Sequence, residues 1–168
     1  YFYTDSVDGA ACGRDVNLKK LIKVLAEQES PQGAMRVEYR EFSRLFELVA
    51  GLVVRNRQPA QLLLISAGPA VQGEIEQAAQ EELMYFMERA VRESLRKVDV
   101  CTRFSSTQFL IILVNAGPEH IEKISRRIFL RFYKLYGLKD IDIRYETAEM
   151  PPLLTDGAAP EPGDPAAT

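Results

Sequence analysis

The strongest constraint on the fold lies between Val100 and Val114, where two apolar segments of different pattern flank a short polar stretch. In the first segment, Val100, Thr102 and Phe104 alternate with Cys101 and Arg103, which predicts a strand. The second segment, 109–114, is an unbroken run of six apolar residues, which is typical of a strand buried on both faces. Ser105 and Ser106 predict a tight turn between the two strands. The sequence therefore predicts a β-hairpin at the centre of a sheet.

Five further segments with a regular apolar pattern, one of them the continuous apolar run 62–65, surround this hairpin. The spacing of their apolar residues predicts helices over 39–56, 73–97 and 119–135, and short strands over 62–65 and 141–145. After the first helix, the order is strand, helix, strand, strand, helix, strand. That order predicts an α/β (α+β) fold with a ferredoxin-like antiparallel sheet covered by two helices, preceded by an extra helix. Many unrelated proteins share this fold, so the fold alone does not indicate a function.

Composition divides the chain into three parts, 1–33, 34–150 and 151–168. The last part holds five of the nine prolines, so it is predicted to be disordered. It also contains three acidic residues and no basic residue, so it carries the whole net charge of -3. The first part contains a short predicted strand, Tyr1-Phe2-Tyr3, and a linker over 28–33. Between them a helix is predicted by the apolar stripe of Leu18, Leu21, Ile22 and Leu25. This strand and helix are similar to the last unit of a receiver domain of two-component signalling.

Charge, hydropathy and the rare residue types argue against several classes of function. The 21 basic and 24 acidic residues show no excess of positive charge, so no nucleic-acid partner is expected. No apolar run approaches the roughly 20 residues that cross a bilayer, so no membrane association is expected. His120 is the only histidine and is predicted to lie on the surface at a helix start, which argues against a His–Cys zinc site. Cys12 and Cys101 are predicted to be buried thiols of a cytoplasmic protein.

The segment around the hairpin carries a resemblance to a known family. It reads Leu95-Arg96-Lys97-Val98-Asp99-Val100-Cys101-Thr102-Arg103-Phe104-Ser105-Ser106-Thr107-Gln108-Phe109 and continues into the apolar run. It resembles the part of the GGDEF (diguanylate cyclase) domain in which Arg-x-x-Asp ends a helix, a strand leads to Arg-Phe or Arg-Tyr, and the GGDEF hairpin follows. The five residues between Asp99 and Ser105 equal the family's gap. The resemblance covers about residues 39–146 and implies the fold of the nucleotidyl cyclases.

The residues that this family uses for catalysis are replaced in the sequence. The resemblance implies a reaction that joins two GTP molecules with two divalent cations, which carboxylates hold. One carboxylate would come from the hairpin, where Thr107 and Gln108 stand, and the other from the end of the first buried strand, which reads Ile65-Ser66-Ala67. The paired glycines are replaced by Ser105-Ser106, while Phe109 keeps the last position of the motif. We therefore expect a degenerate GGDEF domain that is not an enzyme and holds no metal or other cofactor.

The function implied is that of a non-catalytic signalling module in a bacterial two-component system, which acts through contacts with a protein partner or with a second copy of itself. An alternative is a receptor for cyclic di-GMP, because the family binds this product at an Arg-x-x-Asp motif that Arg96 and Asp99 match. Arg92, one helical turn earlier, would add positive charge. The competing interpretation is structural, with Asp99 and Arg96 holding the corner between helix and strand. An enzyme of altered chemistry and an unrelated ferredoxin-like module are the remaining alternatives.

Overall fold

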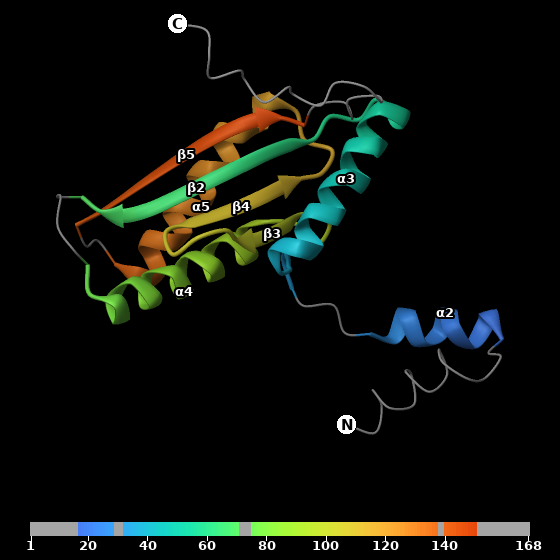
Figure 1. Ribbon diagram of the computed structural model, residues 1–168, viewed down its shortest axis with the longest axis horizontal. Coiled ribbons are helices and arrows are strands. Elements are labelled where there is room, and N and C mark those ends of the chain that lie inside the picture. The colour runs from blue at the N-terminus through green and yellow to red at the C-terminus, as the bar shows by residue number, and fades with distance from the viewer. Residues whose placement is uncertain (1–16, 29–31, 71–74, 138–139, 151–168) are drawn as a thin grey trace, which may run out of the picture. The chain divides into compact units, whose positions relative to one another are not determined.

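The computed structural model describes residues 17–28, 32–70, 75–137 and 140–150, and the chain divides into two compact units, Tyr1–Ser30 and Pro31–Thr168. In the first unit the structure describes one helix, α2 (Leu18–Glu27), which confirms the helix predicted there (Figure 1). Asn17 caps this helix, because its Oδ1 accepts a hydrogen bond from the Lys19 main-chain N–H at 2.8 Å. The strand predicted over residues 1–3, like Cys12 and the segment 151–168, lies outside the described residues. The apolar stripe of α2 is exposed and consists of Leu18, Leu21, Ile22 and Leu25.

The second unit is built around a five-stranded sheet with the strand order β1-β3-β4-β2-β5. The neighbouring pairs β3–β4, β4–β2 and β2–β5 are antiparallel, as in a ferredoxin-like fold, so the predicted sheet and its central hairpin are confirmed. The structure adds β1 at one edge, where it pairs in parallel with β3; the sequence analysis did not predict this strand. The bounds are β1 (Met35–Arg36), β2 (Gln61–Pro69), β3 (Val100–Arg103), β4 (Gln108–Leu113) and β5 (Ile141–Glu149).

Three helices cover the two faces of this sheet. α4 and α5 pack against each other on one face, and α3 packs on the other face (Figure 1). None of the helices in the described part of the chain is long and apolar enough to cross a membrane. The bounds are α3 (Tyr39–Asn56), α4 (Gln77–Ser94) and α5 (Ile121–Tyr136), with a short 3-10 turn, η1 (Pro118–His120), before α5. The bounds of α3 match those of the helix predicted over 39–56.

Strand β4 contributes to two separate cores, because alternate side chains of a strand point to opposite faces of a sheet. Phe109, Ile111 and Leu113 are fully buried in the larger core, with α4 and α5. Ile112 is also fully buried but belongs to the smaller core, where Phe42 of α3 lies. Burial of each such side chain contributes about 1.5–3 kcal/mol, so β4 links both layers of helices to the sheet. This is the buried central strand that the unbroken apolar run predicts.

Strand β2 is longer than predicted and passes beside the hairpin. The sequence Ala67-Gly68-Pro69 predicted a break, yet the strand continues to Pro69, which is paired with Ile141 of β5. Proline is tolerated at this point because the end of a strand can lack one N–H without losing the ladder behind it. Pairing with β4 on one side and β5 on the other outweighs the local turn preference. Ser66 and Ala67 therefore lie in the sheet and not in a loop.

Candidate functional site at the β3–β4 hairpin

Residues 104–107 join β3 to β4 in a tight turn that is closed by its own polar groups. The main-chain N–H groups of Phe104 and Ser105 both donate to the Gln108 carbonyl oxygen, at 2.9 and 3.3 Å. Ser105 Oγ accepts a hydrogen bond from the Thr107 N–H at 3.3 Å and donates to Gln108 Oε1 at 3.2 Å. The tight turn predicted at Ser105-Ser106 is confirmed, and its two ends are fixed to one another.

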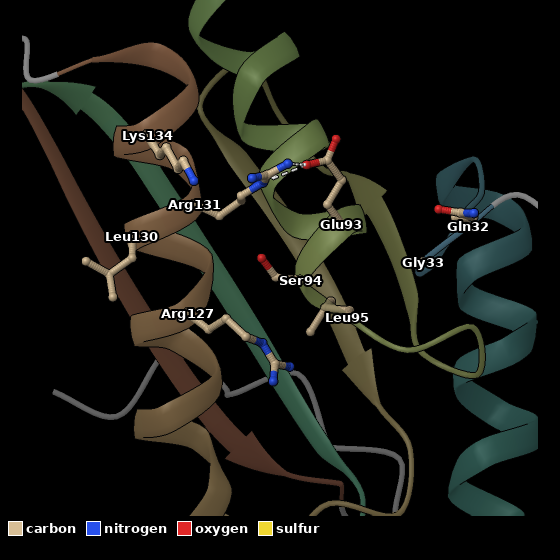
Figure 2. A pocket seen from close by; sticks show the side chains of 9 residues that line it. All are labelled: Gln32, Gly33, Glu93, Ser94, Leu95, Arg127, Leu130, Arg131 and Lys134. Carbon is tan, nitrogen blue, oxygen red and sulfur yellow. Dashed lines mark hydrogen bonds and ion pairs between the residues drawn. The ribbon is translucent and has the colours of Figure 1, made fainter.

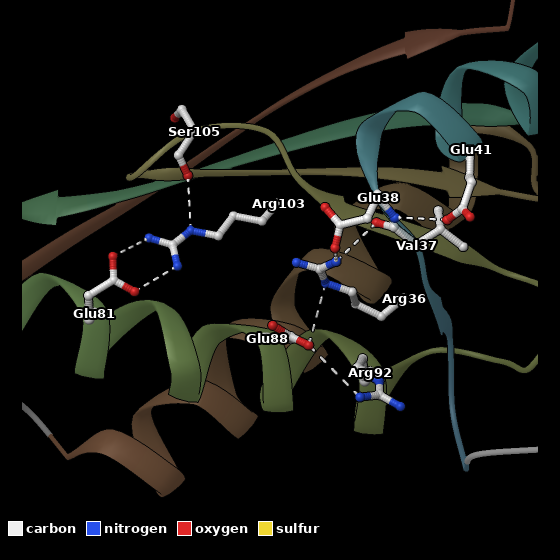
Figure 3. A network of polar contacts seen from close by, with 9 residues as sticks. All are labelled: Arg36, Val37, Glu38, Glu41, Glu81, Glu88, Arg92, Arg103 and Ser105. Carbon is white, nitrogen blue, oxygen red and sulfur yellow. Dashed lines mark hydrogen bonds and ion pairs between the residues drawn. The ribbon is translucent and has the colours of Figure 1, made fainter. Parts of the chain in front are cut away.

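Two residues of α4 attach the hairpin to that helix. Gln80 Nε2 donates to the Ser106 carbonyl oxygen at 2.8 Å, and Glu81 accepts two hydrogen bonds of 2.8 Å from the Arg103 guanidinium. Arg103 Nε also donates to the Ser105 carbonyl oxygen at 3.3 Å (Figure 3). The hydrogen bonds between Glu81 and Arg103 lower the pKa of Glu81 and raise the pKa of Arg103, which favours the charged form of both. The position of the hairpin is therefore set by α4 as well as by the sheet.

The end of β2 lies beside the hairpin, so the structure brings together the two segments where the resemblance places the metal-binding carboxylates of the family. Ser66 is paired with Gln108 across the strands, and Gln108 Nε2 donates to Ser66 Oγ at 3.2 Å. One residue further along, the Ala67 N–H donates to the Thr107 carbonyl oxygen at 2.9 Å. The side chains of Ser66, Thr107 and Gln108 are all uncharged.

The side chains of Ser66, Thr107 and Gln108 are not suitable ligands for the divalent cations that the fold family implies. Magnesium and similar hard cations are held by charged oxygen ligands, whereas Ser66, Thr107 and Gln108 offer hydroxyls and an amide. The carboxylate that reaches the hairpin strand, Glu81, is already bound by Arg103. Within the described ranges, no group of three His, Cys, Asp or Glu side chains is placed to hold a metal ion.

Asp99 is buried and both of its carboxylate oxygens are engaged. Oδ2 accepts the Arg96 main-chain N–H at 3.0 Å, and Oδ1 accepts the Val114 N–H at 3.1 Å. Arg96 Nη2 lies 3.4 Å from Asp99 Oδ1 and donates to the Val114 carbonyl oxygen at 2.5 Å. Asp99 and Arg96 therefore tie the turn after α4 to the end of β4. This geometry supports the structural interpretation of the Arg-x-x-Asp motif.

Arg92 does not join Arg96 and Asp99, contrary to the expectation that it lies one helical turn before Arg96. Leu95 has an extended backbone (φ -111°, ψ 166°) that ends α4 at Ser94, so the helix predicted to reach 97 stops early. The Arg92 side chain instead turns toward Glu88, with Nη1 and Oε1 3.8 Å apart (Figure 3).

Arg96 and Asp99 line a cavity of about 310 Å³ whose other charged side chains come from η1 and α5. These are His120, Lys123 and Arg127. His120 is exposed, as predicted for a surface residue. Lys123 and Arg127 were not predicted as site residues, although their spacing of four residues on a helix places them on one side.

Comparisons with known proteins identify the fold. No family model matches the sequence, and no curated protein matches it. The solved FimX GGDEF domain from Pseudomonas aeruginosa is 16% identical with a TM-score of 0.59, covering 76% of this chain and 82% of that one. The coiled coil and GGDEF domain of DgcB from Caulobacter crescentus, solved in complex with c-di-GMP, is 9% identical with a TM-score of 0.57, covering 88% and 82%. The diguanylate cyclase SiaD from Pseudomonas aeruginosa, solved with its activator SiaC, is 14% identical with a TM-score of 0.57, covering 79% and 54%.

At these identities the likeness concerns the fold. The five-stranded sheet, the hairpin between β3 and β4, and the helices on both faces give the chain the fold of a GGDEF (diguanylate cyclase) domain.

Proposed function

We propose that this chain is a non-catalytic signalling module, a degenerate GGDEF domain that acts through protein contacts and does not make cyclic di-GMP. The observation that carries the proposal is the pairing of Ser66 with Gln108, whose side chains hydrogen-bond to each other at 3.2 Å. These residues stand where the resemblance places the two sources of metal-binding carboxylates.

The physical argument concerns charge. Joining two nucleotides at an α-phosphate requires cations that neutralise the phosphate and activate the attacking hydroxyl, and these cations need anionic ligands. The neutral hydroxyl and the neutral amide are hydrogen-bonded to each other, so they do not compensate a divalent cation for the loss of its bound water. Two neutral positions at once therefore argue for a loss of catalysis more strongly than either would alone.

Titration with Mn²⁺, followed by the electron paramagnetic resonance signal of the free ion, tests this proposal. We expect the free-ion signal to rise as in buffer, because nothing at the hairpin attracts the cation. Stoichiometric binding at micromolar Mn²⁺ that disappears in Ser66→Ala, and is unchanged in the matched control Ser43→Ala on α3, would contradict the proposal.

A second candidate function is a receptor for cyclic di-GMP. It is favoured by one observation, the cavity that Arg96 shares with Lys123 and Arg127, since guanidinium and ammonium groups are suited to phosphates. The solved DgcB structure, in complex with c-di-GMP, gives a precedent within the same fold. Because the Asp99 oxygens are engaged with main-chain groups, the proposed contacts to the ligand come from the basic residues. Titration calorimetry with cyclic di-GMP separates the two functions: no heat, or an affinity that Arg96→Ala leaves unchanged, would rule out the receptor.

The protein contacts proposed for this module include a second copy of the chain. α2 presents an exposed apolar stripe that includes Leu21 and Ile22, and such a stripe is stabilised when it packs against a partner helix. The proposed setting is a bacterial cytoplasm, where the buried free thiol of Cys101 stays reduced. Sedimentation velocity tests the self-association. We expect Leu21→Glu to shift a dimer to monomer while Lys20→Glu, on the polar side, does not; identical sedimentation of all three proteins would contradict it.

A further inference from the structure

Helix α5 carries four basic residues along one side, and they border a groove. Lys123, Arg127, Arg131 and Lys134 are spaced by four, four and three residues, so they lie on one stripe of the helix. At a rise of 1.5 Å per residue, this stripe is about 16 Å long. Figure 2 shows Arg127, Arg131 and Lys134 on the side of α5 that borders the space between this helix and the end of α4.

The groove consists of two adjoining cavities. A cavity of about 740 Å³ is lined by Arg127, Arg131 and Lys134, and the cavity of about 310 Å³ described above contains Lys123. Leu95 and Arg127 line both cavities, so Arg127 stands at their junction. The hollow therefore follows the whole basic stripe.

Five Lys and Arg side chains line the groove against two carboxylates, Glu93 and Asp99, and Asp99 is held by Arg96 and by main-chain N–H groups. Glu93 is already shared by Arg131, whose Nε lies 2.6 Å from Oε2, and by Arg89, whose Nε lies 3.1 Å from Oε1. The hydrogen bond from Arg131 is the main reason that the pKa of Glu93 is lowered. Lys123, Arg127 and Lys134 have no hydrogen-bonded or ion-pair partner within the described ranges.

The spacing of these cations indicates the form of their ligand. A single phosphate could contact one or two of these cations, whereas contact with Lys123, Arg127 and Lys134 together requires anionic groups spread over about 16 Å. Residues four apart on α5 are separated by about 6 Å along the helix axis, and alternate residues of an extended peptide are separated by about 6.6 Å. An extended peptide with an acidic side chain at every second position therefore matches the step from Lys123 to Arg127, and a later acidic side chain of the same peptide can pair with Lys134. The same peptide could place an apolar side chain on Leu130, which lines the larger cavity and is 61% exposed.

We propose that the groove between α5 and the end of α4 binds an extended acidic segment of a partner protein. This inference rests on the proposed function, since it names the surface through which a non-catalytic module makes its protein contacts. Electrostatic complementarity of this kind sets partner choice and the rate of association. The test that follows is independent of catalysis, so it can fail or succeed whatever the protein does with GTP.

The experiment uses the full chain and a fluorescein-labelled peptide in which glutamate alternates with serine around one central leucine. Fluorescence anisotropy is recorded at low salt, against a control peptide with glutamine in place of glutamate. We expect the acidic peptide to bind and the glutamine peptide not to bind. Raising the ionic strength from about 0.05 M to about 0.5 M shortens the screening length and should weaken binding severalfold.

Variants locate the binding on the protein. The test variant is Arg127→Gln with Lys134→Gln, which removes two of the proposed ion pairs with the peptide. Because such exposed ion pairs are weak, we expect the affinity to fall by about fivefold. Arg126→Gln with Lys97→Gln removes the same charge from residues that line neither cavity, and we expect no more than a small change. Circular dichroism melting shows that each variant is folded. Equal effects of the two double variants, equal binding of the glutamine peptide, or tighter binding of a single-stranded oligonucleotide of the same charge would each overturn the proposal.

Discussion

Asp99 illustrates how one carboxylate can hold two distant parts of the chain. Its side chain is 2% exposed, and its oxygens accept N–H groups from Arg96 and from Val114, which lies 15 residues further along the chain. A buried carboxylate is stable only when such donors replace the water it has lost. The bond between the turn after α4 and the end of β4 is therefore part of what positions the hairpin.

Replacing this carboxylate should destabilise the fold. In Asp99→Asn the amide NH₂ group faces one of the two main-chain donors, which is then left without an acceptor. We expect the free energy of unfolding to fall by about 2 kcal/mol, measured by urea denaturation. Asp142→Asn is the matched control, because Asp142 is half exposed and contacts Arg144; it should change stability by less than about 0.5 kcal/mol. A loss at Asp99 as small as that of the control would contradict a structural role.

Cys101 gives a pH dependence with a definite sign. Burial raises the pKa of its thiol from 9.0 to about 12, so the thiol stays protonated in the native state while it ionises in the unfolded chain. The unfolded state then binds fewer protons, and stability falls as the pH rises from about 9 to about 12, by at most about 1.4 kcal/mol per pH unit. The measurement compares unfolding of Cys12→Ser with that of Cys12→Ser/Cys101→Ala over this range. If the free energy of unfolding falls with pH equally in both proteins, Cys101 is not the source of this pH dependence.

At the residue level, the sequence predicted the positions beside the hairpin but not the contacts that hold them. The resemblance to the GGDEF family singled out Ser66 and Gln108, which lie just outside the apolar runs 62–65 and 109–114. Their pairing across β2 and β4 came from the structure. Gln80 and Glu81 could not be found in this way. Their partners, Ser106 and Arg103, are 26 and 22 residues away in the chain, and only the packing of α4 on the sheet brings them together.

Among the secondary structure elements, β1 is the one with no signal in the sequence. It has two residues, and it forms because the Met35 N–H donates to the Asp99 carbonyl oxygen at 2.9 Å and the Ala34 N–H donates to the Arg92 carbonyl oxygen at 3.1 Å. Gly33 precedes it with φ 86°, a conformation that favours glycine. A Cβ atom at this position would lie 1.8 Å from the Arg92 carbonyl oxygen.

Gly33→Ala should therefore release β1 from the edge of the sheet. Both the positive φ and the clash oppose the methyl group, and we expect a loss of about 2 kcal/mol or more in the free energy of unfolding. Gly68→Ala serves as the control, because a Cβ there would meet no atom within 4 Å. Chemical denaturation measures both. Equal stability of the two variants would show that the close approach of Gly33 to Arg92 does not exist in solution.

Introducing charge where β2 and β4 meet tests whether this pair of strands can hold a cation. In Ser66→Asp/Gln108→Glu, two like charges stand directly opposite each other, which should lower stability by about 1 kcal/mol without a divalent cation. A bound cation would offset the repulsion, so we expect Mn²⁺ to raise the melting temperature of the variant and not that of the parent chain. Ser66→Asn/Gln108→Asn is the uncharged control. A variant that does not respond to Mn²⁺ would mean that these two positions cannot form a cation site.

Element boundaries differed from prediction where long-range contacts override local preference. Pro69 ends β2 four residues later than the local sequence indicates, because β4 and β5 both hold the strand. α4 ends at Ser94, earlier than its apolar stripe predicts, because Leu95 turns the chain toward the Asp99 hydrogen bonds. Helix α3, which packs with a simple amphipathic face, was predicted without error.

The domain has the GGDEF fold, with uncharged side chains where β2 meets the start of β4 and a basic groove along α5. The sheet, the hairpin and the helices on both faces follow from apolar periodicity, which is why the sequence predicts them. The groove does not follow from periodicity, because its two walls come from α5 and from the chain around Leu95.

The proposal that the domain does not convert GTP is tested by a turnover assay. The full chain is incubated with radiolabelled GTP and either Mg²⁺ or Mn²⁺, beside an active diguanylate cyclase as a positive control, and the products are separated by anion-exchange chromatography. Because Ser66 and Gln108 are uncharged, we expect no linear dinucleotide and no cyclic di-GMP above a protein-free blank. Either product, formed in proportion to the protein concentration, would contradict it.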